Sequence, residues 1–342
     1  MSSLKEVAAC AQVSTATVSH VINKSAYGSP ALRERALKAV RQVNYSPNAL
    51  ARSLKAKRSE TVGVIVPDIV NSFFIMVVRG AEDALRHEGY TLTLRNSDGN
   101  LDKAELYYNV FKSRQVDGML LIVSPSPYPP EYLRDHNQST TPIVYVDRFQ
   151  SGLLGDVIMA DNTGGSYQAV CHLVDSGHRR IGIITGPLQL INARLRLQGY
   201  KRALRAHQLP ITDQLIRVGK FDVQSGYEQT KELLKLAAPP AAVFVSNALM
   251  TLGFLRALNE AGVRCPRDLA LVCFHDTDWF DFSQPRISAV AQPAYKLGAQ
   301  AAELLVRRMA GTLCGPPFRK VLPTKLIFRD SSVSVRESGR LT

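Results

Sequence analysis

The chain has 342 residues, of which 45% are hydrophobic and 21% are charged, and its formal net charge is +13. These values are typical of a globular protein of two or three domains, and no apolar run reaches the roughly 18 residues that a membrane-spanning helix needs. The start of the chain lacks the apolar segment of a signal peptide, and the five cysteines form no Cys-x-x-Cys pair. We therefore expect a cytoplasmic protein with no membrane attachment, disulfide framework, metal or cofactor.

Positive charge is concentrated at the amino-terminal end. Residues 1–58 contain ten Lys or Arg and two Glu, which is a net charge of +8. A basic segment joined to a nearly neutral remainder is typical of a part that binds a polyanion such as DNA. The alternative is a basic surface that contacts only water, and charge alone does not separate the two.

Two short helices are predicted in this basic segment. Ser3 and Glu6 have the spacing of a capping box, which predicts a helix over residues 3–11. Ser14 suits the N-cap of a second helix that ends near residue 23. Two short helices joined by three or four residues form a helix-turn-helix unit, whose second helix enters the major groove of DNA.

Small polar side chains cover the predicted outer side of the second helix. Val18, Val21 and Ile22 face inward on helical spacing, which leaves the hydroxyl-bearing residues outside. Short hydroxyls, an Ala methyl and an imidazole can contact phosphates and base edges. The predicted DNA-binding residues of this helix are Ser14, Thr15, Ala16, Thr17, Ser19, His20 and Asn23. The alternative is an amphipathic helix whose polar side meets only water.

A third helix and a basic linker follow. Ser29 and Pro30 are typical of a helix start, and Leu32, Ala36, Val40 and Val43 are expected to complete a three-helix core. Residues 46–60 contain a short Ala- and Leu-rich segment that is too short to be a stable helix alone. We interpret it as a hinge that folds on DNA and inserts Leu54 into the minor groove, with Asn48 and Ala51 as further DNA contacts. The alternative is an ordinary helical linker with Leu54 packed on a neighbour.

The segments "LKEVAACAQVSTATVSHVINKS" and "LRERALKAVRQVNYSPNALARSLK" closely resemble the head of the lactose/galactose-repressor (LacI/GalR) family of bacterial regulators. The resemblance implies a homodimeric repressor that binds a pseudo-palindromic operator in double-stranded DNA. It also implies that Thr15, Ala16 and His20 contact bases, that residues 48–54 form the hinge helix, and that Leu54 is the minor-groove wedge.

From residue 61 onward, short apolar segments alternate with helical ones. Strands are expected at residues 61–68, 91–97, 117–124, 142–147, 179–185, 241–246 and 269–276. Helices are expected at residues 71–90, 101–114, 162–176, 191–207 and 248–261. Strands that alternate with helices form parallel sheets with helices on both faces. Because a second series begins near residue 162, we predict two doubly wound α/β lobes with a cleft at the carboxyl ends of their strands.

Residues that follow the predicted strands are candidates for lining this cleft. Aromatic rings can stack on a sugar or a base, and Arg and Asn can bond hydroxyls or a carboxylate. The predicted effector-binding residues are Asn71, Phe73, Asp147, Arg148, Arg196, Phe221, Asn247 and His275. The positive charges of Arg148 and Arg196, together with those of Arg194 and Lys220, favour an acidic or phosphorylated sugar over a neutral one as the ligand. His275 could instead be a surface loop residue, and Trp279 could cap the pocket or belong to a core or dimer contact.

The part of the chain from residue 61 onward resembles the periplasmic-binding-protein-like effector domain of the same family. The resemblance implies a DNA-binding domain at 1–45, a hinge and linker at 46–60, and an effector-binding and dimerisation domain at 61–342. It implies a first lobe from 61–160 and 292–321, and a second from 161–291 and 322–336. Arg196 matches an effector-contacting position and Phe221 a stacking position; Phe73, Asp147, Asn247 and His275 match pocket positions. This chain departs from the family at Ala248 and His275, where Asp is usual.

Three classes of function are compatible with parts of this pattern. We predict a repressor that responds to a sugar or sugar acid, with a purine- or nucleoside-responsive, co-repressed regulator as the alternative. An enzyme is disfavoured because the sequence has no Gly-x-Ser-x-Gly elbow, no phosphate-binding loop and no His-Glu-x-x-His motif. A transport-type binding protein would have a secretion signal and no basic head.

Overall fold

The structure is a computed structural model that describes residues 3–22, 29–45, 58–113, 116–126, 130–134, 141–149, 153 and 155–333. The chain separates into two compact units, a head of residues 1–59 and a body of residues 60–342. Within the described ranges, no helix is long and apolar enough to cross a membrane.

The head contains three helices where the sequence predicts them: α1 (Leu4–Ala11), α2 (Thr15–Ile22) and α3 (Pro30–Gln42). The predicted capping box is present, because the side chain of Ser3 accepts from the backbone N–H of Glu6 and the Glu6 side chain accepts from the backbone of Ser3. Ser14 caps α2, and its Oγ accepts a hydrogen bond of 3.1 Å from the backbone N–H of Thr17. These caps satisfy N–H groups that the first turn of a helix leaves without partners.

A small apolar core holds the three helices together. Its buried members are Val7, Ala8, Ala11, Val18 and Ala39. The expectation that Leu32 belongs to this core is wrong: Leu32 is only half-buried, because α3 directs Ala36 and Ala39 inward instead.

The body contains two six-stranded sheets, and we call each sheet with its helices a lobe. The sheet of lobe one has the order β11-β5-β4-β3-β1-β2 and is entirely parallel. Its elements are β1 (Thr61–Val66), α5 (Ser72–His87), β2 (Thr91–Asn96), α6 (Leu101–Ser113), β3 (Gly118–Leu121), α7 (Glu131–Arg134), β4 (Ile143–Val146), β5 (Asp156–Ala160), α12 (Ala294–Met309) and β11 (Arg319–Leu322).

The sheet of lobe two has the order β12-β10-β9-β8-β6-β7, and only the edge strand β12 is antiparallel to its neighbour. Its elements are α8 (Asn162–Asp175), β6 (Ile181–Thr185), α9 (Ile191–Ala206), η2 (Asp213–Leu215), β7 (Ile216–Val218), α10 (Val223–Leu234), β8 (Ala242–Val245), α11 (Ala248–Glu260), β9 (Ala270–Phe274), η3 (Asp278–Asp281), β10 (Ser288–Ala291), β12 (Lys325–Ile327) and η4 (Asp330–Ser332).

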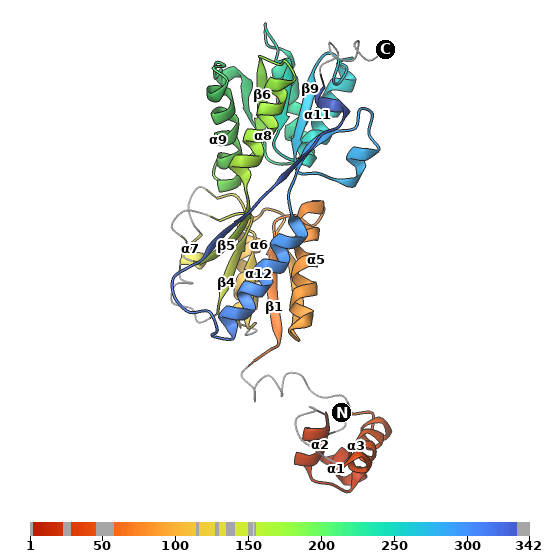
Figure 1. Ribbon diagram of the computed structural model, residues 1–342. Helices are drawn as coiled ribbons and strands as arrows, with labels where there is room; N and C mark the ends of the chain where they lie inside the picture. Colours follow the sequence, from red (N-terminus) through yellow and green to blue (C-terminus); the bar gives the residue numbers. More distant parts are fainter. Residues whose placement is uncertain are drawn as a thin grey trace. The chain divides into compact units, whose positions relative to one another are not determined.

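Helices cover both faces of each sheet, as predicted for a doubly wound fold (Figure 1). In lobe one, α5 and α12 pack on one face and α6 and α7 on the other. In lobe two, α8 and α9 cover one face and α10 and α11 the other. Strands buried on both faces read as continuous apolar runs, and this is why β1, β3, β4, β8 and β9 were predictable.

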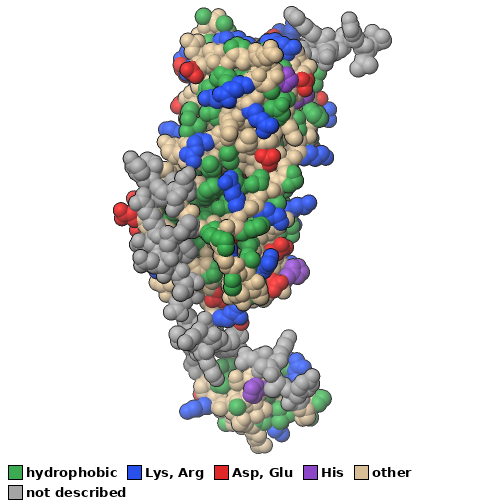
Figure 2. Space-filling view, turned by 60° about the vertical axis from the view of Figure 1, so that its left-hand side comes forward, with side chains coloured by type: hydrophobic (Ala, Val, Ile, Leu, Met, Phe, Trp, Pro, Cys, Tyr) green, Lys and Arg blue, Asp and Glu red, His purple; other side chains and the backbone are tan. Residues whose placement is uncertain are grey.

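The chain passes between the lobes three times. It leaves lobe one after β5, returns after β10, and leaves again between β11 and β12. The last passage is the long blue segment that crosses the body in Figure 1. Three connections at one place join the lobes, which is the arrangement found in proteins that close around a ligand. Lys and Arg side chains are scattered among hydrophobic and acidic ones over the visible face of the body (Figure 2).

Candidate functional site

The polar residues of α2 form the exposed side of the second helix in the head. Because Val18 and Val21 are buried, helical spacing turns the residues between them outward. Ser14, Thr15, Ala16 and His20 are exposed, and Thr17 and Ser19 are half-buried. The structure therefore brings six of the predicted DNA-binding residues to one surface, whereas Asn23, Asn48, Ala51 and Leu54 lie outside the described residues.

A pocket lies in the body between the carboxyl ends of the two sheets, and we call it the inner pocket. It is lined by Asn71, Phe73, Phe74, Asp147, Arg148, Asn192, Arg196, Phe221, Asn247, Ala248, His275 and Gln292. All eight predicted effector-binding residues are among them, drawn from both lobes. Four lining residues lie outside that predicted set: Phe74, Asn192, Ala248 and Gln292. Gln292 follows β10 just as His275 follows β9, so it would have been found had β10 been predicted.

Three residues that line this pocket have left-handed backbone conformations: Asp147 and His275 directly follow β4 and β9, and Phe221 lies three residues after β7. The φ angles are 62° at Asp147, 66° at Phe221 and 94° at His275. This conformation is costly for residues other than Gly and persists only where the surroundings hold it. Such strain is common at functional sites, because it directs side chains where a regular turn would not.

Three charged groups of the inner pocket are buried together. Arg148 Nε lies 3.5 Å from Asp147 Oδ2, and both side chains are less than 10% exposed. Burial raises the pKa of the Asp147 carboxyl, and the positive charges of Arg196 and Arg148 partly offset this. Burial lowers the pKa of Arg196 to about 10, and this group stays charged at neutral pH.

Arg196 is fixed by contacts from lobe two. Its Nε donates to Asn162 Oδ1 at 2.8 Å, and its guanidinium donates to the backbone carbonyl of Ser246 at 2.6 Å. The same guanidinium carbon lies 4.0 Å from the ring centroid of Phe274, which is a cation–π distance. Arg196 therefore projects into the pocket from a rigid base.

Arg148 lies between two aromatic rings that come from different lobes. Its guanidinium carbon is 5.0 Å from the ring centroid of Phe74 in lobe one and 5.3 Å from that of Phe221 in lobe two. The two rings can therefore enclose a flat group at this position.

His275 and Asp147 connect the lobes directly. Asn192 of lobe two donates to Asp147 of lobe one at 3.1 Å. Ser72 Oγ of lobe one lies 3.4 Å from Nε2 of His275 in lobe two, and the Phe73 ring packs edge-on against the imidazole at 5.4 Å. Burial and the charge of Arg196 lower the pKa of His275 to about 4, so the imidazole is neutral at neutral pH.

Several buried polar atoms around the inner pocket have no hydrogen-bond partner among the described residues. They are Asp147 Oδ1, Arg148 Nε, His275 Nδ1 and Gln292 Nε2. Buried polar groups in folded proteins are nearly always bonded, and leaving them unpaired costs free energy. This set offers both donors and acceptors, which suits a ligand with hydroxyl groups.

The cleft has a narrow floor and a wide mouth. The inner pocket has a free volume of about 20 Å³, which is the space of about one water molecule. An outer chamber of about 510 Å³ adjoins it and shares Asn71, Phe74, Arg148 and Phe221 with it. The outer chamber adds Lys220 and three carboxylates, those of Asp68, Asp98 and Asp222.

Two other side chains lie away from the inner pocket. Arg194 donates to the backbone carbonyls of Leu188 and Gln189 and is exposed. Trp279 packs on Phe280 at the margin of a lobe-two core and is not a lining residue, which agrees with the core interpretation rather than with a pocket cap. Over the described ranges, no group of three or more His, Cys, Asp or Glu side chains could hold a metal ion.

The head and the body each match a known protein-family model. Residues 3–48 match the model "Bacterial regulatory proteins, lacI family", and residues 170–332 match a "Periplasmic binding protein-like domain". The ribose operon repressor of Escherichia coli (strain K12) is 35% identical over 309 residues, which cover 90% of this chain and 93% of that protein.

Solved structures of similar proteins are also transcriptional regulators. A lac repressor dimer bound to operator and the anti-inducer ONPF has a TM-score of 0.86 and is 25% identical, with 97% of this chain and 99% of that chain covered. A complex of the transcriptional regulator CelR with cellobiose has a TM-score of 0.74 and is 33% identical, with 97% of this chain and all of that chain covered.

Proposed function

Because the chain belongs to the lacI family of bacterial regulatory proteins, we propose that a sugar or sugar acid binds in the inner pocket and changes the affinity of the head for operator DNA. The protein is a DNA-binding transcriptional repressor and not an enzyme, and its partners are double-stranded operator DNA and a second copy of the same chain. The observation that carries the proposal is the set of buried donors and acceptors, from both lobes, that line one pocket and have no hydrogen-bond partner among the described residues.

The head has the chemistry for reading DNA. We propose that Thr15, Ala16 and His20 contact base edges, and that the hydroxyls of Ser14, Thr17 and Ser19 contact phosphates or base edges. Asn23, Asn48, Ala51 and Leu54 complete the proposed DNA-binding set, with Leu54 as the wedge in the minor groove. In this division, residues 1–45 bind DNA, 46–60 form the hinge, and 61–342 bind the effector and dimerise. We further propose that the protein acts in the cytoplasm at the nucleoid.

The pocket has the chemistry for a polyol. We propose that Asp147 accepts from ligand hydroxyls, that Arg148 and Arg196 donate to hydroxyls or a carboxylate, and that Phe73 and Phe221 contact the ring. Asn71, Asn247 and His275 complete the proposed set. Asn71 and Asn247 cap α5 and α11 with their side-chain oxygens, so their positions are set by the helices.

The sizes of the two spaces bear on the mechanism. A sugar fits the outer chamber but cannot enter a floor of about 20 Å³ until side chains or lobes make room. The contacts of Asn192 with Asp147 and of Ser72 with His275 hold the lobes together and must be exchanged for ligand contacts. A ligand that prefers one arrangement of the lobes shifts the population of the dimer and thereby its operator affinity.

A nucleoside or purine is the second candidate for the effector. The observation in its favour is the pair of rings, Phe74 and Phe221, which both face the position that Arg148 occupies. A flat base could take that position between them.

The experiment is a thermal-shift screen of the full-length protein with ribose, cellobiose, sugar acids, sugar phosphates and nucleosides, followed by operator binding with each hit. A ligand at about 100 times its Kd adds roughly 2.7 kcal/mol to stability. A sugar or sugar acid that both stabilises the protein and changes operator affinity supports the proposal. A response to nucleosides alone favours the second candidate, and a stabilising sugar with no effect on operator binding contradicts the proposed regulation.

A further inference from the structure

The loop between β9 and β10, residues 275–287, begins inside the inner pocket. We call it the pocket loop. Its first residue, His275, is about 9% exposed, has a φ of 94°, and has an Nδ1 without a hydrogen-bond partner among the described residues. A residue with this backbone conformation stays in place only where contacts of the residue and of its neighbours in the chain hold it. On one side, the backbone N–H of His275 donates to the carbonyl of Val290 at 2.9 Å.

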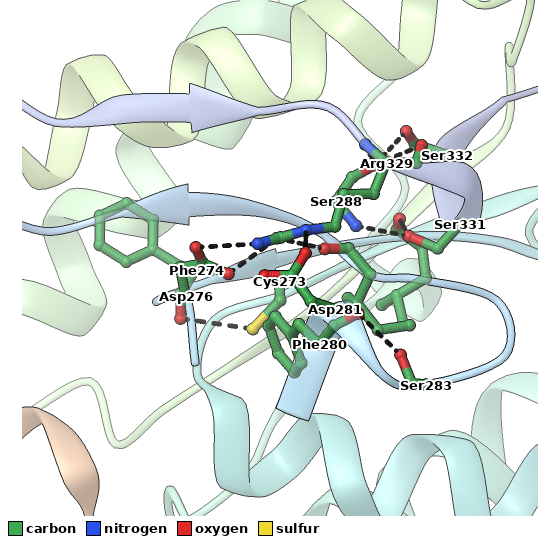
Figure 3. A network of polar contacts seen from close by, with 12 residues as sticks. Cys273, Phe274, Asp276, Phe280, Asp281, Ser283, Ser288, Arg329, Ser331 and Ser332 are labelled. Carbon is green, nitrogen blue, oxygen red and sulfur yellow. Dashed lines mark hydrogen bonds and ion pairs between the residues drawn. The ribbon is translucent and has the colours of Figure 1, made fainter. Parts of the chain in front are cut away.

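The support on the other side comes from one arginine far away in the sequence. Arg329 donates to both carboxylate oxygens of Asp276, at 2.8 and 3.2 Å, and Asp276 is the residue next to His275. It also donates to Asp281 Oδ1 at 2.6 Å and to the backbone carbonyl of Ile287 at 2.8 Å. One guanidinium thus holds the beginning, the middle and the end of the pocket loop. Figure 3 shows Arg329 beside Asp276 and Asp281.

Arg329 is itself firmly held. Its side chain is 8% exposed. Its backbone N–H donates to Ser288 Oγ at 2.8 Å, and its carbonyl accepts from the same hydroxyl at 2.9 Å. Ser288 is the first residue of β10, so the arginine is tied to a strand of the sheet and not to another loop. Bidentate contacts of a buried arginine with carboxylates are strong and fix orientation.

We propose that Arg329 is a positioning residue of the effector pocket: by holding Asp276 and Asp281, it keeps the His275 side chain directed into the inner pocket. Without this anchor, the left-handed backbone at His275 relaxes, and the ring leaves its contacts with Ser72 and Phe73. The consequence for ligand binding rests on the proposed function, but the position of His275 does not.

The chain offers a matched control in a neighbouring arginine–carboxylate pair. Arg286 forms a bidentate contact with Asp330 at 2.9 and 3.0 Å, but both side chains are at least 50% exposed. This pair joins the carboxyl-terminal end of the pocket loop to η4 without touching Asp276 or Asp281. Arg286→Met therefore removes an arginine–carboxylate pair of similar geometry while leaving the anchor of His275 in place.

The first test needs no ligand. The Hε1 proton of His275 is followed by NMR in the full-length protein and assigned by its loss in His275→Gln; the chain contains seven His in all. In Arg329→Met the signal should move by more than its line width toward the value of an unstructured His, while the signal of His207, at the carboxyl-terminal end of α9, stays in place. Arg286→Met should leave all of them unchanged. A His275 signal that is the same in Arg329→Met and wild type overturns the proposal.

Arg329→Lys is a second variant for the case that Arg329→Met does not fold. Lys keeps the charge but cannot form the bidentate contact, so a smaller shift of the His275 signal is expected. If Arg329→Met fails to fold, Arg329→Lys together with Asp281→Asn decides the matter: two unchanged His275 signals overturn the proposal.

The second test links the anchor to binding, with ribose or cellobiose as the probe, whichever binds the wild type. Arg329→Met should weaken binding about tenfold, and the same change in a His275→Ala background should have little further effect, because the anchor acts through His275. Additive losses mean that Arg329 acts elsewhere, and they contradict the proposal. If neither sugar binds the wild type, the proposed function loses support, and the NMR result still decides whether Arg329 positions His275.

Discussion

Asn192 of lobe two donates a hydrogen bond of 3.1 Å to Asp147 of lobe one, and both side chains are almost completely buried. This bond crosses the cleft and satisfies one oxygen of a carboxylate whose pKa is raised by burial. The position of the lobes relative to each other therefore depends on polar contacts that a ligand can replace.

We expect Asn192→Ala to lower the free energy of unfolding by about 1–3 kcal/mol, because it leaves a buried carboxylate oxygen without its donor. Urea unfolding measures the change. Asn259→Ala, on the exposed side of α11, should change stability by less than about 0.5 kcal/mol. Equal effects of the two substitutions would show that the contact across the cleft does not contribute.

We expect Arg196→Met to weaken binding of the effector sugar by at least about 30-fold, or about 2 kcal/mol, because a buried charged donor is lost. Operator binding without sugar should remain. The control is Arg194→Met on the same helix, since Arg194 is exposed and bonds only loop carbonyls outside the pocket. If Arg196→Met still responds at wild-type sugar concentrations, the proposed pocket is misplaced.

Acidification should destabilise the body through His275. Its pKa is lowered from 6.5 to about 4 in the folded state, so below pH 6.5 the unfolded chain takes up a proton that the folded protein does not. This contribution to stability is present above pH 6.5 and is lost as the pH falls to about 4, with a total of about 3 kcal/mol.

The measurement is the difference in unfolding free energy between wild type and His275→Gln at pH 7 and at pH 4.5. The variant should lose less stability on acidification, since Gln does not titrate. Asp147 titrates with the opposite sign, but it is present in both proteins and cancels in the difference. Parallel pH profiles of the two proteins would refute the assignment.

Helices α5 and α12 approach so closely that a side chain at Gly298 has no space. A Cβ at this position would overlap the carbonyl oxygen of Val77. We expect Gly298→Ala to destabilise lobe one by about 1–3 kcal/mol in thermal or urea unfolding. Gly182→Ala is the control, because its Cβ would meet its nearest neighbour, the Leu215 oxygen, at 3.4 Å. A Gly298→Ala variant as stable as Gly182→Ala would contradict this packing.

In the head, His20→Ala should reduce the preference for operator over unrelated DNA by about 1–3 kcal/mol, because a base-reading side chain is lost. Lys38→Ala, on the exposed side of α3, should weaken binding to both DNAs by the same factor, since charge attracts any phosphate backbone. Competition binding at fixed salt separates the two. An unchanged preference in His20→Ala would remove His20 from the base-reading set.

Much of this protein could be predicted from its sequence, because the relevant signals are local. Capping at Ser3 and Ser14 depends on neighbours three residues away, and both caps are present. Long apolar runs identify strands that are buried on both faces. Five strands were not predicted: β5, β7, β10, β11 and β12. Most residues of β7, β11 and β12 are exposed or half-buried, whereas β5 and β10 are buried but short, and each begins with a polar residue.

Only the tertiary structure decided which residues meet at the inner pocket and what supports them. Asp147 and His275 are 128 positions apart in the sequence, and Arg329 lies a further 54 positions beyond His275. The rule that polar residues follow strands selects the correct edge of each sheet, but it does not tell how the two edges face each other. That depends on three passages of the chain between the lobes and on buried contacts such as Arg329 with Asp276. A local sequence pattern reflects only the surroundings of neighbouring residues. A pocket is formed by packing between segments that are far apart in the sequence, and no periodic pattern in the sequence indicates which of these segments meet.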